Sequence, residues 1–278
     1  MALGATEPLP ALANDLRRRV IDVLWRTQAG HPGGSLSPAE IVAALYFGVM
    51  RIDPADPSWE ARDRFILSKG HAAPIYYVAL QRRGYFDEEL FETYDEIDSC
   101  IQAHPDPHTP GVDMASGSLG QGLSAGVGMA LGARLKGLPS RVFVLLGDGE
   151  LQEGQVWEAV MSAAKFGLDN LVAIIDDNRV QLTGDTCSTL PVEPIAAKWR
   201  AFNWHVLEID GHDPDAVVRA CDEAAATRGL PTVIIARTVK GKGVSFMENT
   251  CAWHSAAVTD DVRERALAEL GAGEVGSR

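Results

Sequence analysis

The residues best suited to chemistry follow two apolar runs in the middle of the chain. Gly147-Asp148-Gly149 comes directly after the run 142–146, and Asn178 comes shortly after the run 171–175. Between these runs apolar residues recur at helical spacing, which predicts a strand, a helix and a second strand. Parallel strands joined by a right-handed crossover end at the same edge of a sheet. We therefore expect Asp148 and Asn178 to be neighbours in space.

These two side chains predict a site for a hard divalent cation. Mg²⁺ accepts carboxylate and amide oxygens, and a backbone carbonyl just after Asn178, such as that of Val180, could add a third ligand. The unfilled positions suit phosphate oxygens, and a cation bound by a single carboxylate can still attract a diphosphate. The alternative is an ordinary α/β turn in which Asp148 caps a helix and Asn178 lies in a loop.

Length, composition and charge exclude several classes of protein. The 278 residues are 46% hydrophobic, which is enough to bury a full core. A formal charge of −13 argues against a nucleic-acid or anionic-membrane partner. Four cysteines without CxxC spacing suggest neither a zinc site nor a disulfide framework. No leader and no apolar run of membrane-spanning length are present, so we expect a cytoplasmic protein.

The order of predicted elements favours a single α/β domain. We expect a loose lead-in at residues 1–10 and one domain over residues 11–278, because no linker or repeat divides the chain. The predicted fold is a three-layer sandwich with a mostly parallel sheet between helices. Its elements include an amphipathic helix from Leu12 that ends near Gly30, further strands at 64–67, 204–209 and 232–237, and a charged helix at 260–270.

Several histidines stand in predicted turns. His31 lies in His31-Pro32-Gly33-Gly34, which we expect to form a turn, and Ser37-Pro38 is expected to cap the next helix. His71 ends the segment 68–71, where a strand meets a helix at the ligand-binding edge of such sheets. His104 and His108 lie in a Pro- and Asp-rich stretch that predicts an ordered loop. A single histidine in a turn is more often structural than catalytic.

Two glycine-rich segments have open interpretations. The segment 116–122 precedes a helix of small residues, and its glycines could admit a ligand or allow close helix packing. Against an apolar ring, the useful groups would be the backbone of Gly117 and the side chain of Leu119. The run Lys240-Gly241-Lys242-Gly243 lacks the Walker spacing, so it could contact phosphate or be a flexible surface loop.

Taken together, these motifs resemble those of transketolase, a family of thiamine diphosphate enzymes. The resemblance runs from about residue 10 to 258 and covers only the family's first domain. It implies the thiamine-diphosphate-binding fold, in its diphosphate-binding module, and the N-terminal subunit of a split transketolase. The motifs that carry it are His31-Pro32-Gly33-Gly34, Ser68-Lys69-Gly70-His71, Gly117-Ser118-Leu119-Gly120-Gln121-Gly122, Gly147-Asp148-Gly149 with Asn178, and Lys240-Gly241-Lys242-Gly243.

The resemblance also implies cofactors and partners. The cofactors are thiamine diphosphate and Mg²⁺, for which Ca²⁺ or Mn²⁺ can substitute, and the reaction moves a two-carbon ketol unit from a ketose phosphate to an aldose. A C-terminal subunit would supply the missing pyrimidine-binding domain and the glutamate that activates the cofactor. The expected assembly is a dimer of heterodimers that is inactive without this partner.

Carried onto this sequence, the family pattern assigns a set of site residues. The pKa values of the catalytic imidazoles are expected near neutrality, where they suit proton exchange with sugar hydroxyls. Glu153, Glu158, Gln121 and His212 receive no definite role. The implied residues are the metal ligands Asp148, Asn178 and the Val180 carbonyl, the catalytic His31, His71, His104 and His254, and the cofactor-binding His71, Gly117, Ser118, Leu119, Gly147, Asp148, Gly149, Glu150 and Asn178.

Departures from the family pattern leave the substrate open. Ala103 and Ser255 replace glycines that are usual beside two of the histidines, and Ala115-Ser116 replaces a frequent Thr-Thr. None of them touches a predicted metal ligand. The alternatives are another thiamine-dependent system, of the deoxyxylulose-phosphate-synthase or 2-oxo-acid decarboxylating kind, and a non-catalytic interaction subunit that retains the fold.

Overall fold

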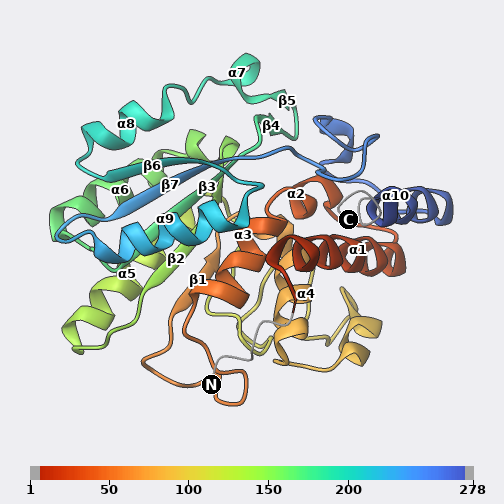
Figure 1. The fold of residues 1–278 in the computed structure, drawn as a ribbon, viewed down its shortest axis with the longest axis horizontal. Helices are drawn as coiled ribbons and strands as arrows, with labels where there is room; N and C mark the ends of the chain where they lie inside the picture. The colour runs from red at the N-terminus through yellow and green to blue at the C-terminus, as the bar shows by residue number, and fades with distance from the viewer. Residues whose placement is uncertain (1–6, 273–278) are drawn as a thin grey trace.

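Five parallel strands form the central sheet of the computed structural model, which describes residues 7–272 (Figure 1). The strand order is β1-β2-β3-β7-β6, and a separate two-stranded hairpin, β4-β5, follows β3. The strands are β1 (Arg64–Leu67), β2 (Val142–Gly147), β3 (Leu171–Asp177), β4 (Val180–Gln181), β5 (Gly184–Asp185), β6 (His205–Asp210) and β7 (Thr232–Arg237).

Helices cover both faces of this sheet, as the sequence predicted (Figure 1). One face carries α1, α3, α4 and α9, and the other carries α5, α6 and α8. The helices are α1 (Leu9–Thr27), α2 (Pro32–Leu36), α3 (Ala39–Ala44), α4 (Ala73–Arg83), α5 (Gln121–Leu135), α6 (Gly154–Phe166), α7 (Thr186–Thr189), α8 (Ile195–Ala201), α9 (Pro214–Ala226) and α10 (Asp260–Ala272).

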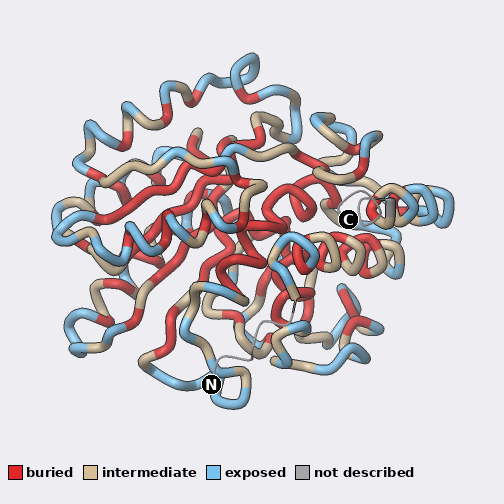
Figure 2. The backbone as a smooth tube through the Cα atoms, in the orientation of Figure 1, coloured by how far each residue is buried: buried red, intermediate tan, exposed pale blue. Residues whose placement is uncertain are grey.

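The side chains along each central strand alternate between two hydrophobic cores. Along β2, Phe143 and Leu145 pack into the core under α1, α3 and α4, whereas Val144 and Leu146 pack into the core under α5 and α6. Successive side chains of a strand point to opposite faces. Both faces are covered, so the strands read as continuous apolar runs rather than as alternating patterns. The buried sheet is visible as the band of buried backbone through the middle of Figure 2.

Several predicted boundaries need correction. Helix α1 begins at Leu9, so the lead-in expected over residues 1–10 was two residues too long at its end, and residues 1–6 lie outside the described part of the chain. The segment 31–34 is not an isolated turn, because it opens α2 with Pro32 in the first position, where its missing N–H costs nothing. Ser37 does not cap α3; its hydroxyl donates to Asp176 instead, at 2.6 Å.

The strand register places the predicted site at one edge. Gly147 pairs with Asp176 across β2 and β3, so Asp148 and Asn178 follow adjacent positions at the carboxyl end of the sheet. The backbone N–H of Asp148 donates to the Asp176 carbonyl at 3.4 Å. This proximity confirms the expectation drawn from the βαβ pattern. Within residues 7–272, every helix is too short or too polar to cross a membrane.

Candidate active site

The carboxyl ends of β1, β2 and β3 and the loop after β7 surround a cavity of about 240 Å³. Open parallel sheets bind ligands at this edge. The lining combines polar side chains with glycine backbone, and it includes most of the predicted cofactor and metal residues. From the sequence predictions the cavity collects His71, Leu119, Gly147, Asp148, Gly149, Glu150, Asn178, Val180 and His254, together with Lys69 and Lys240.

Asp148 is a buried carboxylate at this cavity, with 3% of its surface exposed. Burial, and then the nearby charges of Asp176 and Asp177, raise its pKa to about 6. Its Oδ2 atom accepts a hydrogen bond from the Thr186 hydroxyl at 3.1 Å. Within residues 7–272 no salt bridge reaches this carboxylate, so a cation in the cavity would relieve its desolvation.

The Asn178 amide is held in a fixed orientation. Its Nδ2 donates to Asp176 at 3.0 Å, and its Oδ1 accepts from the backbone N–H of Val180 at 3.1 Å. The amide oxygen is therefore assigned to the side of the Asn178–Val180 turn. Together with the Asp148 carboxylate and the Val180 carbonyl, it supplies the type of donors that Mg²⁺ accepts.

Asp176 lies beneath these groups and joins four segments of the chain. Its carboxylate accepts from Lys69 at 2.5 Å, from the hydroxyls of Ser37 and Thr238, and from Asn178. Burial alone would raise the pKa of Asp176, but the Lys69 ammonium and the hydroxyl donors hold it below its ordinary value. Asp176 is thus an ionised anchor for Lys69 and Asn178, two residues that line the cavity.

The four predicted catalytic histidines converge, although they come from four distant segments. The His31 ring centroid lies 5.3 Å from that of His71, 6.2 Å from that of His104 and 5.6 Å from that of His254. His71 and His254 are 4.9 Å apart. Of these four, His71 and His254 line the cavity. His108 does not join the group; it is exposed and bonds Asp106.

The prediction that these imidazoles titrate near neutrality is wrong for His71 and His254, and the pKa of His31 is also lowered. Burial, and then the charge of Lys69, lower the pKa of His71 well below its ordinary value. Burial and Lys240 lower the pKa of His254 to about 3, and burial and His104 lower that of His31. These rings are therefore neutral at pH 7, and each can donate through one nitrogen and accept through the other.

Lys240 contradicts the flexible-loop interpretation of the Lys-Gly-Lys-Gly run. Its side chain is buried, and its Nζ donates to the Val180 carbonyl at 2.7 Å and to Nδ1 of His254 at 2.8 Å. Burial and the charge of Lys69 lower its pKa to about 8. Since His254 accepts at Nδ1, its proton is assigned to Nε2.

Glu150 has a role in holding the backbone around the cavity. Its Oε1 accepts from the Ser68 hydroxyl and from the Gly120 N–H at 2.9 Å, and its Oε2 accepts from the Gly147 N–H at 3.1 Å. The carboxylate is buried and lines the cavity, as expected for a cofactor-binding residue. The bonds that it makes in this structure join three of the sequence motifs to one another.

The glycine segment is placed partly as predicted. Gly117 has a φ of +136°, and a Cβ there would lie 2.8 Å from Cδ2 of His104, so only glycine allows this close approach. Leu119 lines the cavity, whereas Gly117 and Ser118 are outside its lining, and Ser118 is exposed. Gln121, which bonds Gln155, and Glu158 are exposed on the surface. Glu153 is also exposed, but it lines the cavity.

His212 belongs to a buried polar network next to the site. Its Nδ1 donates to Glu40 at 2.9 Å, and its Nε2 accepts from the backbone N–H of Val239, the residue before Lys240. Arg17 binds both oxygens of Glu40, at 2.6 and 2.5 Å. Burial favours the neutral acid, but the bond from His212 and the charge of Arg17 lower the pKa of Glu40 to about 2. This network fixes the start of the Lys240 loop.

No definite role could be assigned from the sequence to Lys69, Asp176, Lys240 or Thr186. All four are buried. A lysine inside a strand-end motif and an aspartate inside an apolar strand are the signals that could have revealed Lys69 and Asp176, because buried charges are nearly always paired. Thr186 has no comparable signal in the sequence.

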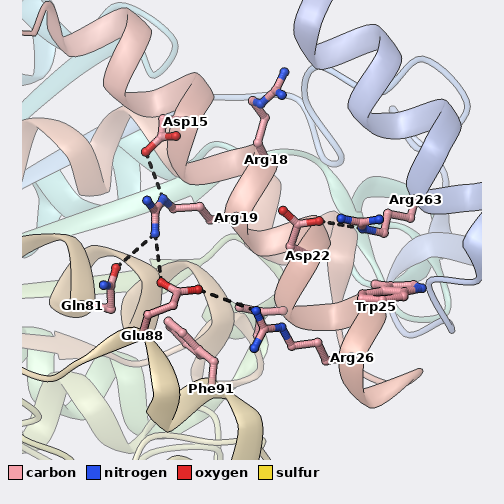
Figure 3. A pocket seen from close by; sticks show the side chains of 11 residues that line it. Asp15, Arg18, Arg19, Asp22, Trp25, Arg26, Gln81, Glu88, Phe91 and Arg263 are labelled. Atoms are coloured by element: carbon pink, nitrogen blue, oxygen red, sulfur yellow. Dashed lines mark hydrogen bonds and ion pairs between the residues drawn. The ribbon is translucent and has the colours of Figure 1, made fainter.

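A larger cavity, of about 580 Å³, lies elsewhere, between α1, α4 and α10 (Figure 3). Its charged residues largely neutralise one another: Arg19 pairs with Asp15 and Glu88, and Arg263 pairs with Asp22 at 2.7 Å. These side chains are about one-third to one-half exposed, where ion pairs contribute little. We therefore assign no site to this cavity.

The residues around the smaller cavity fit a divalent cation and a diphosphate. Asp148 is a buried anion without a cationic partner at salt-bridge distance in the described residues, and Lys69 and Lys240 add positive charge beside it. No three acidic, histidine or cysteine side chains of residues 7–272 form a metal cluster by themselves. A site of one carboxylate, one amide and one carbonyl would rely on ligand oxygens to complete its coordination.

Comparisons with known proteins agree with this chemistry. Residues 10–274 match the family model described as "Transketolase, thiamine diphosphate binding domain". The 6-deoxy-6-sulfo-D-fructose transketolase subunit SqwG of Clostridium sp. (strain MSTE9) is 46% identical, over 93% of this chain and 94% of that protein. A subunit of the apulose-4-phosphate transketolase of Phocaeicola vulgatus is 39% identical, over 95% of this chain and 94% of that protein.

Full-length transketolases match over a smaller share of their length. Human transketolase is 39% identical, over 95% of this chain but 42% of its own. The solved transketolase of Leishmania mexicana superposes with a TM-score of 0.90 at 31% identity, over 95% of this chain and 41% of that one. The chain belongs to the transketolase family, and it corresponds to the thiamine diphosphate binding domain of that family.

Proposed function

We propose that this chain works as the diphosphate-binding subunit of a split transketolase, which moves a two-carbon ketol unit from a ketose phosphate to an aldose acceptor. The observation that carries the proposal is the convergence of four imidazoles at the sheet edge that holds Asp148 and Asn178. Relatives that match over nearly their whole length are named as transketolase subunits, which supports this reading over other thiamine-dependent reactions.

The residues at the cavity suggest how cofactors would be held. Asp148, the Asn178 amide and the Val180 carbonyl would ligate Mg²⁺, or Ca²⁺ or Mn²⁺ in its place. The Lys240 ammonium, which lines the same cavity, would add positive charge beside the diphosphate. When bound, thiamine diphosphate supplies the electron sink for cleaving a carbon–carbon bond next to a carbonyl. Gly117 and Leu119 are proposed to face its ring.

The histidines would orient the sugar substrate and exchange protons with its hydroxyls. His254 presents Nε2–H as a donor because Lys240 occupies its Nδ1. His31 and His71 are neutral at pH 7, so each combines one donor with one acceptor. His104 lies at the edge of the group, against the Gly117 backbone. Such a set suits a substrate with several adjacent hydroxyls.

The activity would require a partner. We propose a C-terminal subunit with the pyrimidine-binding domain, assembled with this chain as a dimer of heterodimers in the cytoplasm. Two relatives are named for sugars with a sulfo or a phosphate group, both of which are anionic. We therefore propose a sugar donor with an anionic substituent, bound jointly by both subunits.

The test is ketol transfer by the purified chain with and without the product of a neighbouring gene that encodes the pyrimidine-binding domain. A panel of sulfo- and phospho-sugars, with Mg²⁺ and thiamine diphosphate, covers the proposed donors. We expect transfer only with both proteins present. Robust turnover by this chain alone would contradict the split site, and decarboxylation of 2-oxo acids without ketol transfer would favour the alternative thiamine-dependent reaction.

A further inference from the structure

Thr186 contacts both halves of the proposed metal site. It is the first residue of α7 and is 1% exposed. Its Oγ1 lies 3.1 Å from Oδ2 of Asp148 and 3.3 Å from the carbonyl oxygen of Arg179. Its backbone N–H donates to the same carbonyl at 3.0 Å. One residue therefore links the tip of β2 to the turn that follows β3.

The hydroxyl proton of Thr186 is best assigned to Asp148. A hydroxyl has one hydrogen to donate, and the carboxylate is both the closer and the charged acceptor. The Arg179 carbonyl already accepts the Thr186 N–H. Each donor of Thr186 thus has its own acceptor, and the Asp148 carboxylate is held through Oδ2 while Asp148 still lines the cavity.

The turn at Arg179 needs such a restraint. Arg179 has a φ of +66°, in the left-handed region that residues other than glycine rarely adopt. It stands between Asn178 and Val180, the two proposed ligands on this side. Its guanidinium bonds Asp177 at 3.2 Å and Glu193 at 2.5 Å, while its carbonyl is held by Thr186. The β4-β5 hairpin adds a second connection between the same two segments, since Val180 pairs with Asp185.

We propose that Thr186 is a positioning residue for the metal site, which fixes the Asp148 carboxylate relative to the Asn178–Val180 turn. This inference rests on the proposed function, because it assumes that these groups bind Mg²⁺. Partners that orient metal ligands commonly contribute 10- to 100-fold to metal affinity. The hydroxyl, rather than the volume of the side chain, is the group that carries the effect.

The experiment compares three variants in the complex with the partner subunit. Thr186→Val keeps the shape and removes the hydroxyl, and Thr186→Ser keeps the hydroxyl. Thr189→Val is the matched control, because Thr189 is exposed in the same short helix and its hydroxyl donates to the Asp185 carbonyl at 2.9 Å. Isothermal titration gives the Mn²⁺ affinity at saturating thiamine diphosphate. Thermal unfolding checks the fold, and Thr186→Ala serves if the valine variant does not fold.

We expect Thr186→Val to weaken Mn²⁺ binding by roughly 10- to 100-fold, Thr186→Ser to stay within about 3-fold of wild type, and Thr189→Val to match wild type. An unchanged affinity in Thr186→Val, or an equal loss in the valine and serine variants, would overturn the inference while leaving the proposed function standing. Failure of the wild-type complex to bind thiamine diphosphate with the metal would overturn both.

Discussion

The Nζ atom of Lys240 lies 2.8 Å from Nδ1 of His254, and both side chains line the cavity at the carboxyl edge of the sheet. This contact joins the loop after β7 to the last of the four converging histidines. Burial, and then the charge of this ammonium group, lower the pKa of His254 to about 3. Lys240 thereby contributes to keeping a proposed catalytic residue neutral.

Replacing Lys240 with methionine tests this relationship. The substitution Lys240→Met removes the charge but keeps most of the apolar stem, so the pKa of His254 is expected to rise. It should remain below the ordinary value, because burial is the larger cause of the shift. NMR titration of the imidazole signals measures the change. Lys242→Met is the control, and a His254 pKa that is the same in wild type and Lys240→Met would contradict the assignment.

The buried histidines predict how the stability of the cofactor-free chain depends on pH. The folded pKa values of His71 and His254 lie below the unfolded value of about 6.5. Below that pH the unfolded chain binds protons that the folded chain excludes, so stability falls as the pH drops from 7 towards 4. Urea unfolding at several pH values should show a shallower decline in His254→Gln than in wild type.

The matched control for this experiment is His108→Gln, because His108 is exposed and outside the cluster. Its stability should follow the wild-type pH profile. Parallel profiles for wild type and His254→Gln would show that His254 is not held neutral by the fold.

The network around Glu40 predicts a large difference between buried and exposed ion pairs. Glu40→Ala leaves Arg17 and His212 buried without their acceptor, which is expected to cost about 3–5 kcal/mol of unfolding free energy. Glu88→Ala removes a half-exposed acceptor in the cavity between α1, α4 and α10 (Figure 3), and it should cost less than about 1 kcal/mol of unfolding free energy. Chemical denaturation measures both free energies of unfolding. Equal losses would contradict the prediction that Glu40 stabilises the fold more than Glu88.

The sequence predicted the strands well because each is an apolar run with a sharp end. β1 and β7 have the predicted bounds, and the tips of β2 and β3 lie where the crossover rule put them. Helix α2 was not predicted, because its five residues are too few to show helical periodicity. The predicted cap at Ser37 failed because a buried carboxylate on a distant strand competes for its hydroxyl.

The positions of Asp148 and Asn178 at strand ends could be predicted from the sequence pattern. The four histidines were assigned through the resemblance to transketolase, and their catalytic roles are proposals. The lowered pKa values of His71 and His254 depend partly on the charges of Lys69 and Lys240. No local sequence pattern reveals that these two lysines are buried. The same holds for Thr186, which meets Asp148 only through the β4-β5 hairpin.

The role of Asp148 is decided by calorimetric titration of thiamine diphosphate into the complex of this chain with its partner, with Mg²⁺ and with a chelator. We predict Mg²⁺-dependent binding in wild type and none in Asp148→Asn. We also predict a gain of about 1–3 kcal/mol in the stability of the cofactor-free variant at pH 7, because the pKa of Asp148 is raised to about 6. Unchanged cofactor affinity in Asp148→Asn would show that this carboxylate does not hold the metal and its diphosphate.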